Sequence, residues 1–321
     1  MKRNLYFALC APASAGGGIL HCVLDGTELV PVRLYPCDRP MYLTVSEDRM
    51  FVLLRAPFAD SRESGMCSCR ISEDGTLSEP DAVQSTRGEV ACHLCVLDGN
   101  VYAVNYSSGS VIRFPNLVAA HHGHSVHPTR QEGPHTHCIV PTPDGQYLAV
   151  CDLGLDKIIL YDRGLQPVSE VSTPAGSGPR HLVFSDDGRE AFCACELSSS
   201  LCVFSYHAGT LEFLYEVPCL PADHRGESYP AAIRYLEGRV YVSNRGHDSV
   251  TVFERAGERF SPVRRIPTQG SYPRDFDIFG SVLVAANERS GSVSITSLSD
   301  GIPQSSSLFE GLPTPLCVIK G

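Results

Sequence analysis

The sequence has no apolar run that approaches the roughly 18 residues needed to span a bilayer, so no membrane-spanning helix is expected. It also has no block of Lys or Arg, and its formal net charge of −10 argues against a nucleic-acid-binding surface. No linker, low-complexity tract or amphipathic helix marks a second domain. The 321 residues are 43% hydrophobic and 19% charged, which is typical of a globular protein. We therefore expect a single domain spanning residues 1–321, with no membrane or nucleic-acid partner.

The first fifteen residues leave two interpretations open. Two basic residues, a short apolar stretch and Ala13-Ser14-Ala15 resemble a secretory signal peptide. The apolar stretch is shorter than usual for such a peptide, and the same residues fit the opening strand of the repeat described below. We favour the strand.

The cysteines and histidines are numerous but do not form a recognisable metal site. Most of the fourteen cysteines lie inside strand-like runs, where cysteine behaves as a small buried hydrophobe. Cys92-His-Leu-Cys95 is the only pair with two-residue spacing, and no second pair completes a zinc site. The histidine cluster between His121 and His127 is interpreted as a solvated loop rather than an adventitious metal site. We expect a reduced, cytoplasmic protein with no metal and no cofactor.

Internal repeats dominate the sequence. Each repeat has an apolar strand, a polar corner and a second β-rich strand, and the five clearest copies are residues 100–114, 146–161, 190–204, 239–253 and 281–295. The predicted corner residues are Asn105, Asp152, Glu196, Asn244 and Asn287. Successive corners are 47, 44, 48 and 43 residues apart, so the period is near 45 residues. Two weaker copies, residues 4–24 and 49–71, extend the repeat to seven units.

A β period of this length predicts an all-β fold, a seven-bladed β-propeller with four antiparallel strands in each blade. Stacked blades bury faces that one hairpin cannot cover, and closure of the ring removes exposed strand edges. The N-terminal strand is expected to pair with the C-terminal segment around Leu316–Ile319. A solenoid and a pair of sandwiches fit the pattern less well.

The stretch from Gly178 to Glu196 predicts a hairpin with candidate site residues at its ends. Asp187-Gly188 between two alternating runs is a strong turn signal. A hairpin returns its ends to one rim, so Arg180 and Glu196 are expected to lie close together. Taken alone, such a pair is more often a surface ion pair than a site.

The other repeats place similar residues at the same positions. Before the hairpins stand Pro134-His-Thr-His137, Tyr229–Ile233 and Tyr272–Phe276, and after them stand Asp152, Asn244-Arg245 and Asn287-Glu288. In a propeller these positions meet at one mouth of the ring, which favours a site over an isolated ion pair.

These motifs resemble the lactonase family of seven-bladed β-propellers. The resemblance rests on Gly178-Pro-Arg-His181 with Glu196, on Ser243–Ser249, on Pro273–Phe276 with Ala286-Asn287, and on Asn105–Ser110. That family contains the propeller-type 6-phosphogluconolactonases and is similar to the fungal carboxy-cis,cis-muconate cyclases. The resemblance covers residues 5–318 approximately and is strongest from 133 to 292.

The resemblance implies a site of one histidine, arginines and one glutamate. The residues carried over as catalytic are His137, Arg180, Glu196 and Arg245, and those carried over as substrate-binding are His135, His181, Asn244, His247 and Arg274. His137 is preferred to His135 because it directly precedes the strand. His181 and His247 can equally be supporting or turn residues, and Asp248 and Ser249 are expected to make corner hydrogen bonds.

Lactone hydrolysis accounts for these residue types. It requires a base that deprotonates water and a donor for the developing oxyanion. Glu196 is expected to be a general base and His137 a general acid or base. Arginines bind a phosphate or carboxylate bidentately and can polarise a carbonyl.

One departure from the family concerns the residue before Ile233. Family members have Ala-Glu-Ile or Ala-Asp-Ile where this chain has Ala231-Ala232-Ile233, so a carboxylate is lost beside the expected site. Three functions therefore stay open. The first is hydrolysis of a sugar lactone, above all 6-phosphogluconolactone in the pentose phosphate pathway. The second is action on another anionic lactone or muconate-type cycloisomerisation, and the third is a non-catalytic binding propeller. The expected partner is a small anionic lactone, and a monomer or weak dimer is expected.

Overall fold

The computed structural model describes residues 2–321, and these form an all-β fold. Their 28 strands are arranged in seven four-stranded antiparallel sheets, and a single 3-10 turn lies at Ala13–Ala15. The predicted fold class, a seven-bladed β-propeller with four antiparallel strands per blade, is confirmed. We number the blades 1 to 7 in chain order.

The strands within each blade are hydrogen-bonded in chain order, except in blade 1, where the last strand of the chain is added. Blade 1 contains β28 (Pro315–Lys320), β1 (Arg3–Leu9), β2 (Gly18–Asp25) and β3 (Glu28–Pro36). Blade 2 contains β4 (Pro40–Ser46), β5 (Arg49–Leu54), β6 (Glu63–Arg70) and β7 (Gln84–Glu89). Blade 3 contains β8 (Ala91–Leu97), β9 (Asn100–Asn105), β10 (Ser110–Arg113) and β11 (Leu117–Ala120).

The remaining four blades follow without interruption. Blade 4 contains β12 (Thr136–Pro141), β13 (Leu148–Asp152), β14 (Lys157–Tyr161) and β15 (Pro167–Ser172). Blade 5 contains β16 (Pro179–Phe184), β17 (Glu190–Cys195), β18 (Ser200–His207) and β19 (Thr210–Pro218). Blade 6 contains β20 (Tyr229–Leu236), β21 (Arg239–Arg245), β22 (Ser249–Ala256) and β23 (Arg259–Pro267). Blade 7 contains β24 (Pro273–Ile278), β25 (Val282–Asn287), β26 (Ser292–Ser299) and β27 (Ile302–Glu310).

The chain divides into two compact units. One unit comprises the residues up to Ser85 together with Ile266–Gly321, and the other comprises Thr86–Arg265. The first contains blades 1 and 7 and most of blade 2, and the second, which we call unit 2, contains blades 3, 4 and 5 and most of blade 6. The expectation of one domain over the whole chain stays a prediction.

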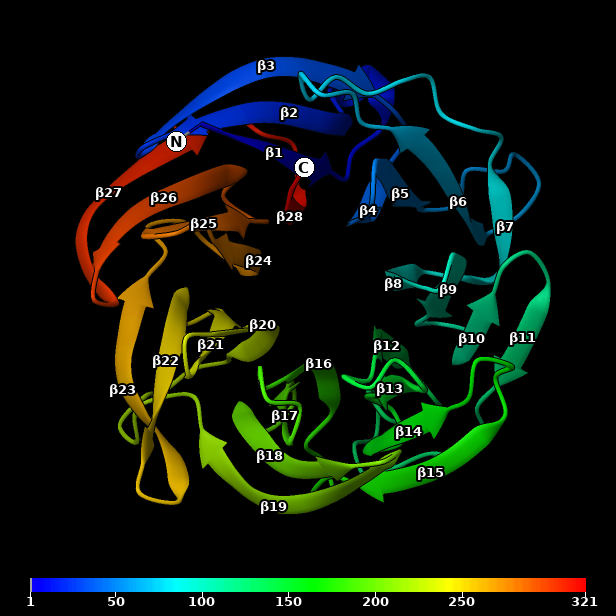
Figure 1. The fold of residues 1–321 in the computed structure, drawn as a ribbon, viewed down its shortest axis with the longest axis vertical. Helices are drawn as coiled ribbons and strands as arrows, with labels where there is room; N and C mark the ends of the chain where they lie inside the picture. The colour runs from blue at the N-terminus through cyan, green and yellow to red at the C-terminus, as the bar shows by residue number, and fades with distance from the viewer. Residues whose placement is uncertain (1) are drawn as a thin grey trace. The chain divides into compact units, whose positions relative to one another are not determined.

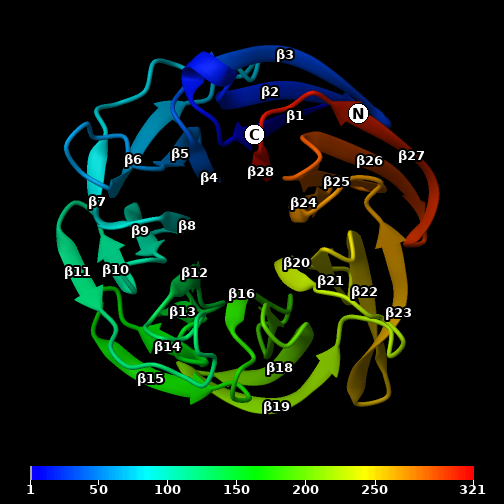
Figure 2. The same cartoon turned by 180° about the vertical axis from the view of Figure 1, so that it is seen from behind.

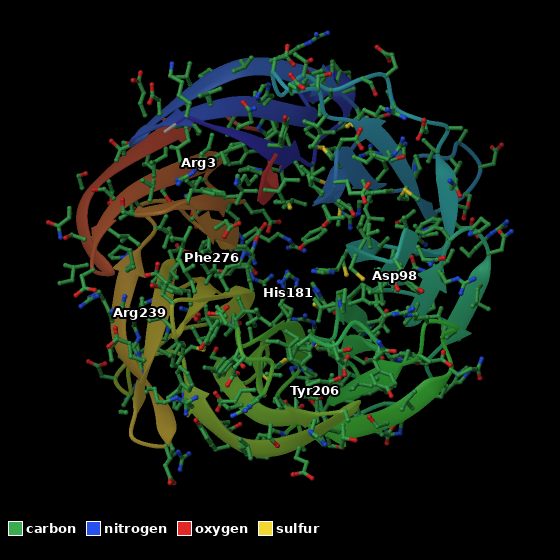
Figure 3. The ribbon with its side chains drawn as sticks, in the orientation of Figure 1. Arg3, Asp98, His181, Tyr206, Arg239 and Phe276 are labelled. Carbon is green, nitrogen blue, oxygen red and sulfur yellow. The ribbon has the colours of Figure 1, made fainter. Side chains whose placement is uncertain are left out.

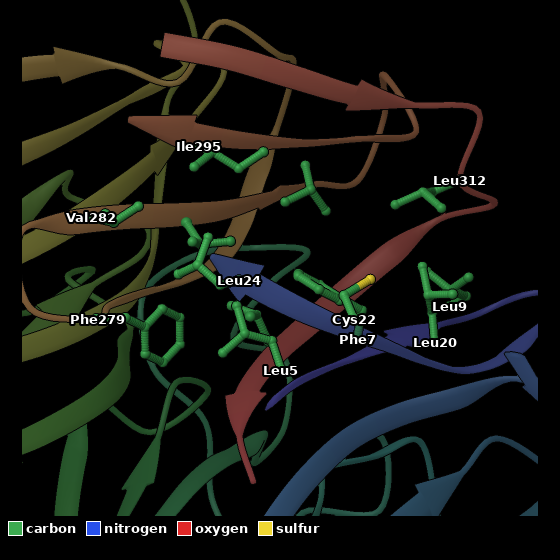
Figure 4. Packing of buried hydrophobic residues seen from close by; sticks show 13 residues of the cluster. Leu5, Phe7, Leu9, Leu20, Cys22, Leu24, Phe279, Val282, Ile295 and Leu312 are labelled. Carbon is green, nitrogen blue, oxygen red and sulfur yellow. The ribbon is translucent and has the colours of Figure 1, made fainter. Parts of the chain in front are cut away.

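The two ends of the chain share blade 1. Strand β1 pairs with β28 from Leu5 opposite Lys320 to Leu9 opposite Pro315, which confirms the predicted pairing. The residues that resembled a signal peptide therefore begin with a strand, β1. Apolar side chains of blades 1 and 7, among them Phe7 and Val284, form one buried cluster (Figure 4).

The first strand of every blade carries a β-bulge near its start, after the first paired residue or, in blade 6, after the second. The extra residues are Leu316, Met41, Cys92, His137, Arg180, Ala231 with Ala232, and Arg274. A bulge leaves its residue unpaired and turns its side chain away from the regular alternation. Two of the predicted catalytic residues, His137 and Arg180, occupy bulges.

The second strand of each blade has, at or next to its end, a corner residue that pairs with both neighbouring strands. The corner residues are Leu9, Leu54, Asn105, Asp152, Cys195, Asn244 and Asn287. Cys195, and not Glu196, therefore occupies the corner of blade 5. The corner residue predicted from the repeat is wrong by one position in this blade. Glu196 and Arg245 lie directly after their corners, as Tyr106 does in blade 3.

In unit 2 the first strands β8, β12, β16 and β20 lie side by side in that order (Figures 1 and 2). His181 on β16 lies on the inner side of blade 5, whereas Tyr206 on β18 lies nearer its outer edge (Figure 3). Cys138, Cys151 and Cys193 lie in the apolar cluster between blades 4 and 5. This burial confirms the interpretation of the strand cysteines as small hydrophobes. Across residues 2–321, no helix has both the length and the apolar character required to cross a membrane.

Candidate functional site

Glu196 lies at the centre of a cluster of arginines within unit 2. Its Oε2 atom accepts a hydrogen bond from Arg245 Nη2 at 2.6 Å and lies 3.0 Å from Arg180 Nε. Its Oε1 atom accepts a hydrogen bond from Arg130 Nη2 at 2.5 Å. Both carboxylate oxygens are thus engaged by guanidinium groups, and the Glu196 side chain is only 6% exposed.

Arg180 and Arg245 are fixed by main-chain carbonyls as well as by Glu196. Arg180 Nη1 donates to the carbonyl of Ala231 at 2.8 Å, so the bulge of blade 5 reaches the bulge of blade 6. Arg245 Nε donates to the carbonyl of Tyr229 at 3.1 Å. The side chains of these two arginines are 2% and 6% exposed. They form a buried pair of cations on either side of one carboxylate oxygen of Glu196.

Arg130 is a member of the cluster that sequence reasoning missed. It lies in the segment between β11 and β12, and its side chain is 34% exposed. Its Nη2 atom also lies 3.5 Å from the hydroxyl of Tyr106. No repeat position or motif marks Arg130, because the segment that carries it lies outside the repeated hairpins.

The carboxylate of Asp152 holds both ends of this segment. Its Oδ2 atom lies 2.6 Å from His121 Nδ1, and its Oδ1 atom accepts the main-chain N–H of His135 at 2.8 Å. His121 also lies 2.8 Å from the hydroxyl of Tyr161 through Nε2 and is buried. The prediction of a solvated histidine loop is therefore wrong for His121, because the Asp152 corner holds its ring in the interior.

His137 lies beside the arginine cluster, in the bulge of blade 4. Its ring makes edge-to-face contacts with Tyr106 and His181, with centroids 5.5 and 5.4 Å apart. Cys92, in the bulge of blade 3, places its Sγ atom 3.8 Å from His137 Nδ1 and 3.3 Å from the His137 carbonyl. His181 in turn contacts His93, so three imidazoles from successive blades lie in a row.

The other predicted binding residues take up separate positions. His135 stacks on Tyr106 with ring centroids 4.4 Å apart. Asn244 is fully buried, and its amide donates to Thr251 Oγ1 at 2.9 Å within blade 6. The Nδ1 atom of His247 lies 2.7 Å from the hydroxyl oxygen of Ser249. Ser249 therefore makes a hydrogen-bonding contact in the corner, as predicted. These contacts of Asn244 and His247 support structural roles in the corner of blade 6.

Two further residues of the sequence analysis, Arg274 and Ala232, make contacts of their own. Arg274 belongs to the unit that contains blade 7, where its Nη1 atom lies 3.0 Å from Glu288. Ala232 is fully buried, and its N–H donates to Ser243 Oγ at 3.0 Å. Glu196 is therefore the carboxylate that the three arginines of the cluster share.

The geometry can be compared with known proteins. The model of a protein family described as "Lactonase, 7-bladed beta-propeller" matches residues 5–319. The chain belongs to the lactonase family. The recognition of this family from the sequence motifs is confirmed.

Similar structures cover this lactonase-family chain along its full length. A Lactobacillus plantarum protein is 29% identical with a TM-score of 0.90, over 100% of this chain and 99% of that one. The periplasmic gluconolactonase PpgL of Pseudomonas aeruginosa is 26% identical with a TM-score of 0.89, over the same shares. An uncharacterised Staphylococcus aureus protein is 32% identical over 257 residues, which are 73% of this chain and 75% of that protein.

The arginines determine the ionisation of Glu196 in this lactonase-family site. Burial by itself would raise the pKa of the Glu196 carboxyl. Positive charges outweigh burial and hold that pKa well below its ordinary value, in the order Arg245, Arg180, His137 and Arg130. Burial, followed by the charge of Arg180, lowers the pKa of His181 well below its ordinary value. Glu196 is therefore a permanent anion and His181 a neutral ring near pH 7.

The depressed pKa of Glu196 predicts a specific loss of stability in acid. Because the folded pKa lies below that of the unfolded chain, the stabilisation is complete above about pH 4.3 and is lost as the pH falls further. We expect the unfolding free energy of the wild type to fall more steeply below that pH than that of Glu196→Gln. Urea unfolding followed by circular dichroism at a series of acid pH values measures both. Parallel curves would contradict the assignment.

Proposed function

We propose that this chain hydrolyses an anionic sugar lactone, with 6-phosphogluconolactone as its substrate and 6-phosphogluconate as its product. The observation that carries the proposal is the cluster of three arginines around one buried carboxylate, with His137 beside it. In a chain of net charge −10 this local excess of positive charge is a specific feature. It suits an anionic substrate and an oxyanion that develops during the reaction.

His137 is the general base of this proposal, and Glu196 is a positioning residue. A carboxylate whose two oxygens are held by three guanidinium groups is a weak base, because proton transfer is efficient when the pKa of the base lies near the working pH. Imidazole is the side chain that most often serves as a general acid or base. This assignment moves the role of base, which the residue types alone suggested for Glu196, to His137.

The proposed reaction uses these side chains in turn. His137 takes a proton from water as the water oxygen attacks the lactone carbonyl. Arg180 and Arg245 donate hydrogen bonds to the oxyanion, and Glu196 keeps both guanidinium groups in place. The ring C–O bond breaks, and the leaving oxygen takes the proton from His137. The product is a hydroxy acid, and no step calls for a group beyond these residues and water.

The setting that we propose is the cytoplasm and the oxidative branch of the pentose phosphate pathway. The use of Cys138, Cys151 and Cys193 as buried core thiols supports a reducing compartment. A candidate 6-phosphogluconolactonase of Bacteroides uniformis, 25% identical over 100% of this chain and 99% of that one with a TM-score of 0.87, supports the substrate. The similar protein PpgL is periplasmic. The cytoplasmic location of this chain is therefore a proposal.

The decisive experiment is a pH-stat assay with freshly prepared 6-phosphogluconolactone. We expect acid release well above the spontaneous rate, with loss of that excess in Arg180→Gln. The matched control is Arg163→Gln, because Arg163 is an exposed arginine paired with Asp98 at 2.8 Å outside the cluster. Absence of activity on any lactone, together with ring closure of a carboxylated muconate, would replace the hydrolase by a cycloisomerase. Absence of both would leave a binding propeller.

A further inference from the structure

Arg130 differs from the other arginines of the cluster in the donors that it keeps available. Arg180 and Arg245 are almost fully buried, whereas about a third of the Arg130 side chain is exposed. Its Nη2 atom contacts Glu196 and Tyr106. Within residues 2–321, its Nε and Nη1 atoms make no hydrogen bond or ion pair. A guanidinium group presents five N–H donors in a rigid plane, so Arg130 retains donors for an incoming oxyanion.

The segment that carries Arg130 is built to hold it in place. The next residue, Gln131, is fully buried, and its Nε2 atom donates to the carbonyl of Leu153 at 2.9 Å. Gln131 Oε1 accepts the main-chain N–H of His127 at 3.0 Å. Together with the Asp152 contacts at both ends of the segment, these bonds fix the backbone beneath Arg130. A guanidinium group that is positioned in advance loses little entropy when it binds a ligand.

The charges around Arg130 favour a dianion. Three guanidinium groups share one carboxylate, that of Glu196. The nearest further acid on the segment is Glu132, whose Oε1 atom lies 3.6 Å from His135 Nε2. A neutral sugar lactone leaves the excess of positive charge uncompensated. A phosphate monoester carries a charge of about −1.5 to −2 near pH 7, which matches the excess.

We propose that Arg130 recognises a phosphate monoester carried by the lactone and thereby determines the specificity of the site. Arg180 and Arg245, which are buried and held by main-chain carbonyls, serve the carbonyl end of the same substrate. The two roles are divided by exposure. The partly exposed Arg130 binds the solvated phosphate, and the buried Arg180 and Arg245 bind the reacting carbonyl. The inference rests on the proposed lactonase function.

The test compares two lactones that differ in the phosphate alone. For Arg130→Gln we expect the ratio of kcat/KM on 6-phosphogluconolactone to kcat/KM on gluconolactone to fall about 10- to 100-fold, mainly through KM. Arg130→Lys keeps the charge but loses the planar fork, so an intermediate fall is expected. Arg163→Gln removes an exposed guanidinium group elsewhere and is expected to leave the ratio unchanged. Thermal unfolding of each variant checks that the fold persists.

Product binding separates this inference from the proposed function. Calorimetry measures the affinities of the wild type and Arg130→Gln for 6-phosphogluconate and for gluconate. If the wild type hydrolyses neither lactone but prefers 6-phosphogluconate, and Arg130→Gln loses the preference, the proposed function fails and the role of Arg130 stands. Equal losses on both lactones, or a preference that survives in Arg130→Gln, would overturn the role of Arg130. Failure of the wild type to bind or hydrolyse any of the four compounds would also overturn it.

Discussion

Replacing Glu196 with glutamine is expected to destabilise the protein by about 3–5 kcal/mol. The substitution keeps the shape of the side chain but removes the one negative charge between Arg180 and Arg245, whose side chains are 2% and 6% exposed. Two buried cations would then face each other without a counter-ion. Because neither can be deprotonated near neutral pH, the cost appears as lost stability. Urea or thermal unfolding at pH 7 measures it.

Glu288→Gln is the matched control for this prediction. Glu288 lies directly after the corner of blade 7, as Glu196 does in blade 5, and it pairs with Arg274 at 3.0 Å. Both side chains of that pair are 24% exposed, and partly solvated pairs contribute about 0–1 kcal/mol. The difference between the two variants isolates the effect of burial and of the extra arginines. If both variants lose the same stability, Glu196 does not hold a buried cationic cluster.

The strand pattern was readable from the sequence because it depends on local chemistry that recurs. Asp187-Gly188 predicted the turn between β16 and β17. Strand β16 ends at Phe184, and β17 begins at Glu190. The alternation of apolar residues repeats in each blade, since one face of every strand packs on the neighbouring blade. A repeat with a period near 45 residues therefore predicted the number of blades and the pairing of the two chain ends.

The bulges were not readable in the same way. A bulge changes the register by one residue, and nothing in the residue types at Cys92, His137 and Arg180 announces it. The same one-residue uncertainty placed Glu196 in a corner that Cys195 occupies. The sequence analysis expected Arg180 beside Glu196, and Arg180 Nε lies 3.0 Å from Glu196 Oε2. Register alone would have left the direction of the Arg180 side chain undetermined.

Arg130 shows where sequence reasoning ends. It is 66 positions from Glu196, in a segment without periodicity. Its place depends on the contacts of Gln131 and His121 with the corner of blade 4. Such tertiary contacts leave no local signal. The resulting cluster also changes the chemistry, because a third arginine makes Glu196 a weaker base than two would.

His137→Gln is expected to lower kcat on the lactone by about 10²- to 10⁴-fold, the range that a general acid or base contributes. Glutamine keeps a polar side chain of similar reach but cannot accept a proton from water. The acid limb of the wild-type pH profile reports the ionisation of the base and should disappear in the variant. The pKa values of Glu196 and His181 are both held well below their ordinary values, by the neighbouring arginines for Glu196 and by burial for His181.

His135→Gln tests the alternative that the sequence left open. His135 lies two residues before His137, but its ring stacks on Tyr106, and its Nδ1 atom lies 3.1 Å from the Tyr106 carbonyl oxygen, which can only accept a hydrogen bond. Loss of that stacking shifts the ring of Tyr106, so a fall of less than about tenfold in kcat is expected, with the acid limb retained. The reverse result, a large loss in His135→Gln and a small one in His137→Gln, would transfer the role of base to His135. Because the two histidines are two residues apart and only His137 occupies the bulge, the comparison tests whether the bulge position, rather than the presence of an imidazole, selects the base.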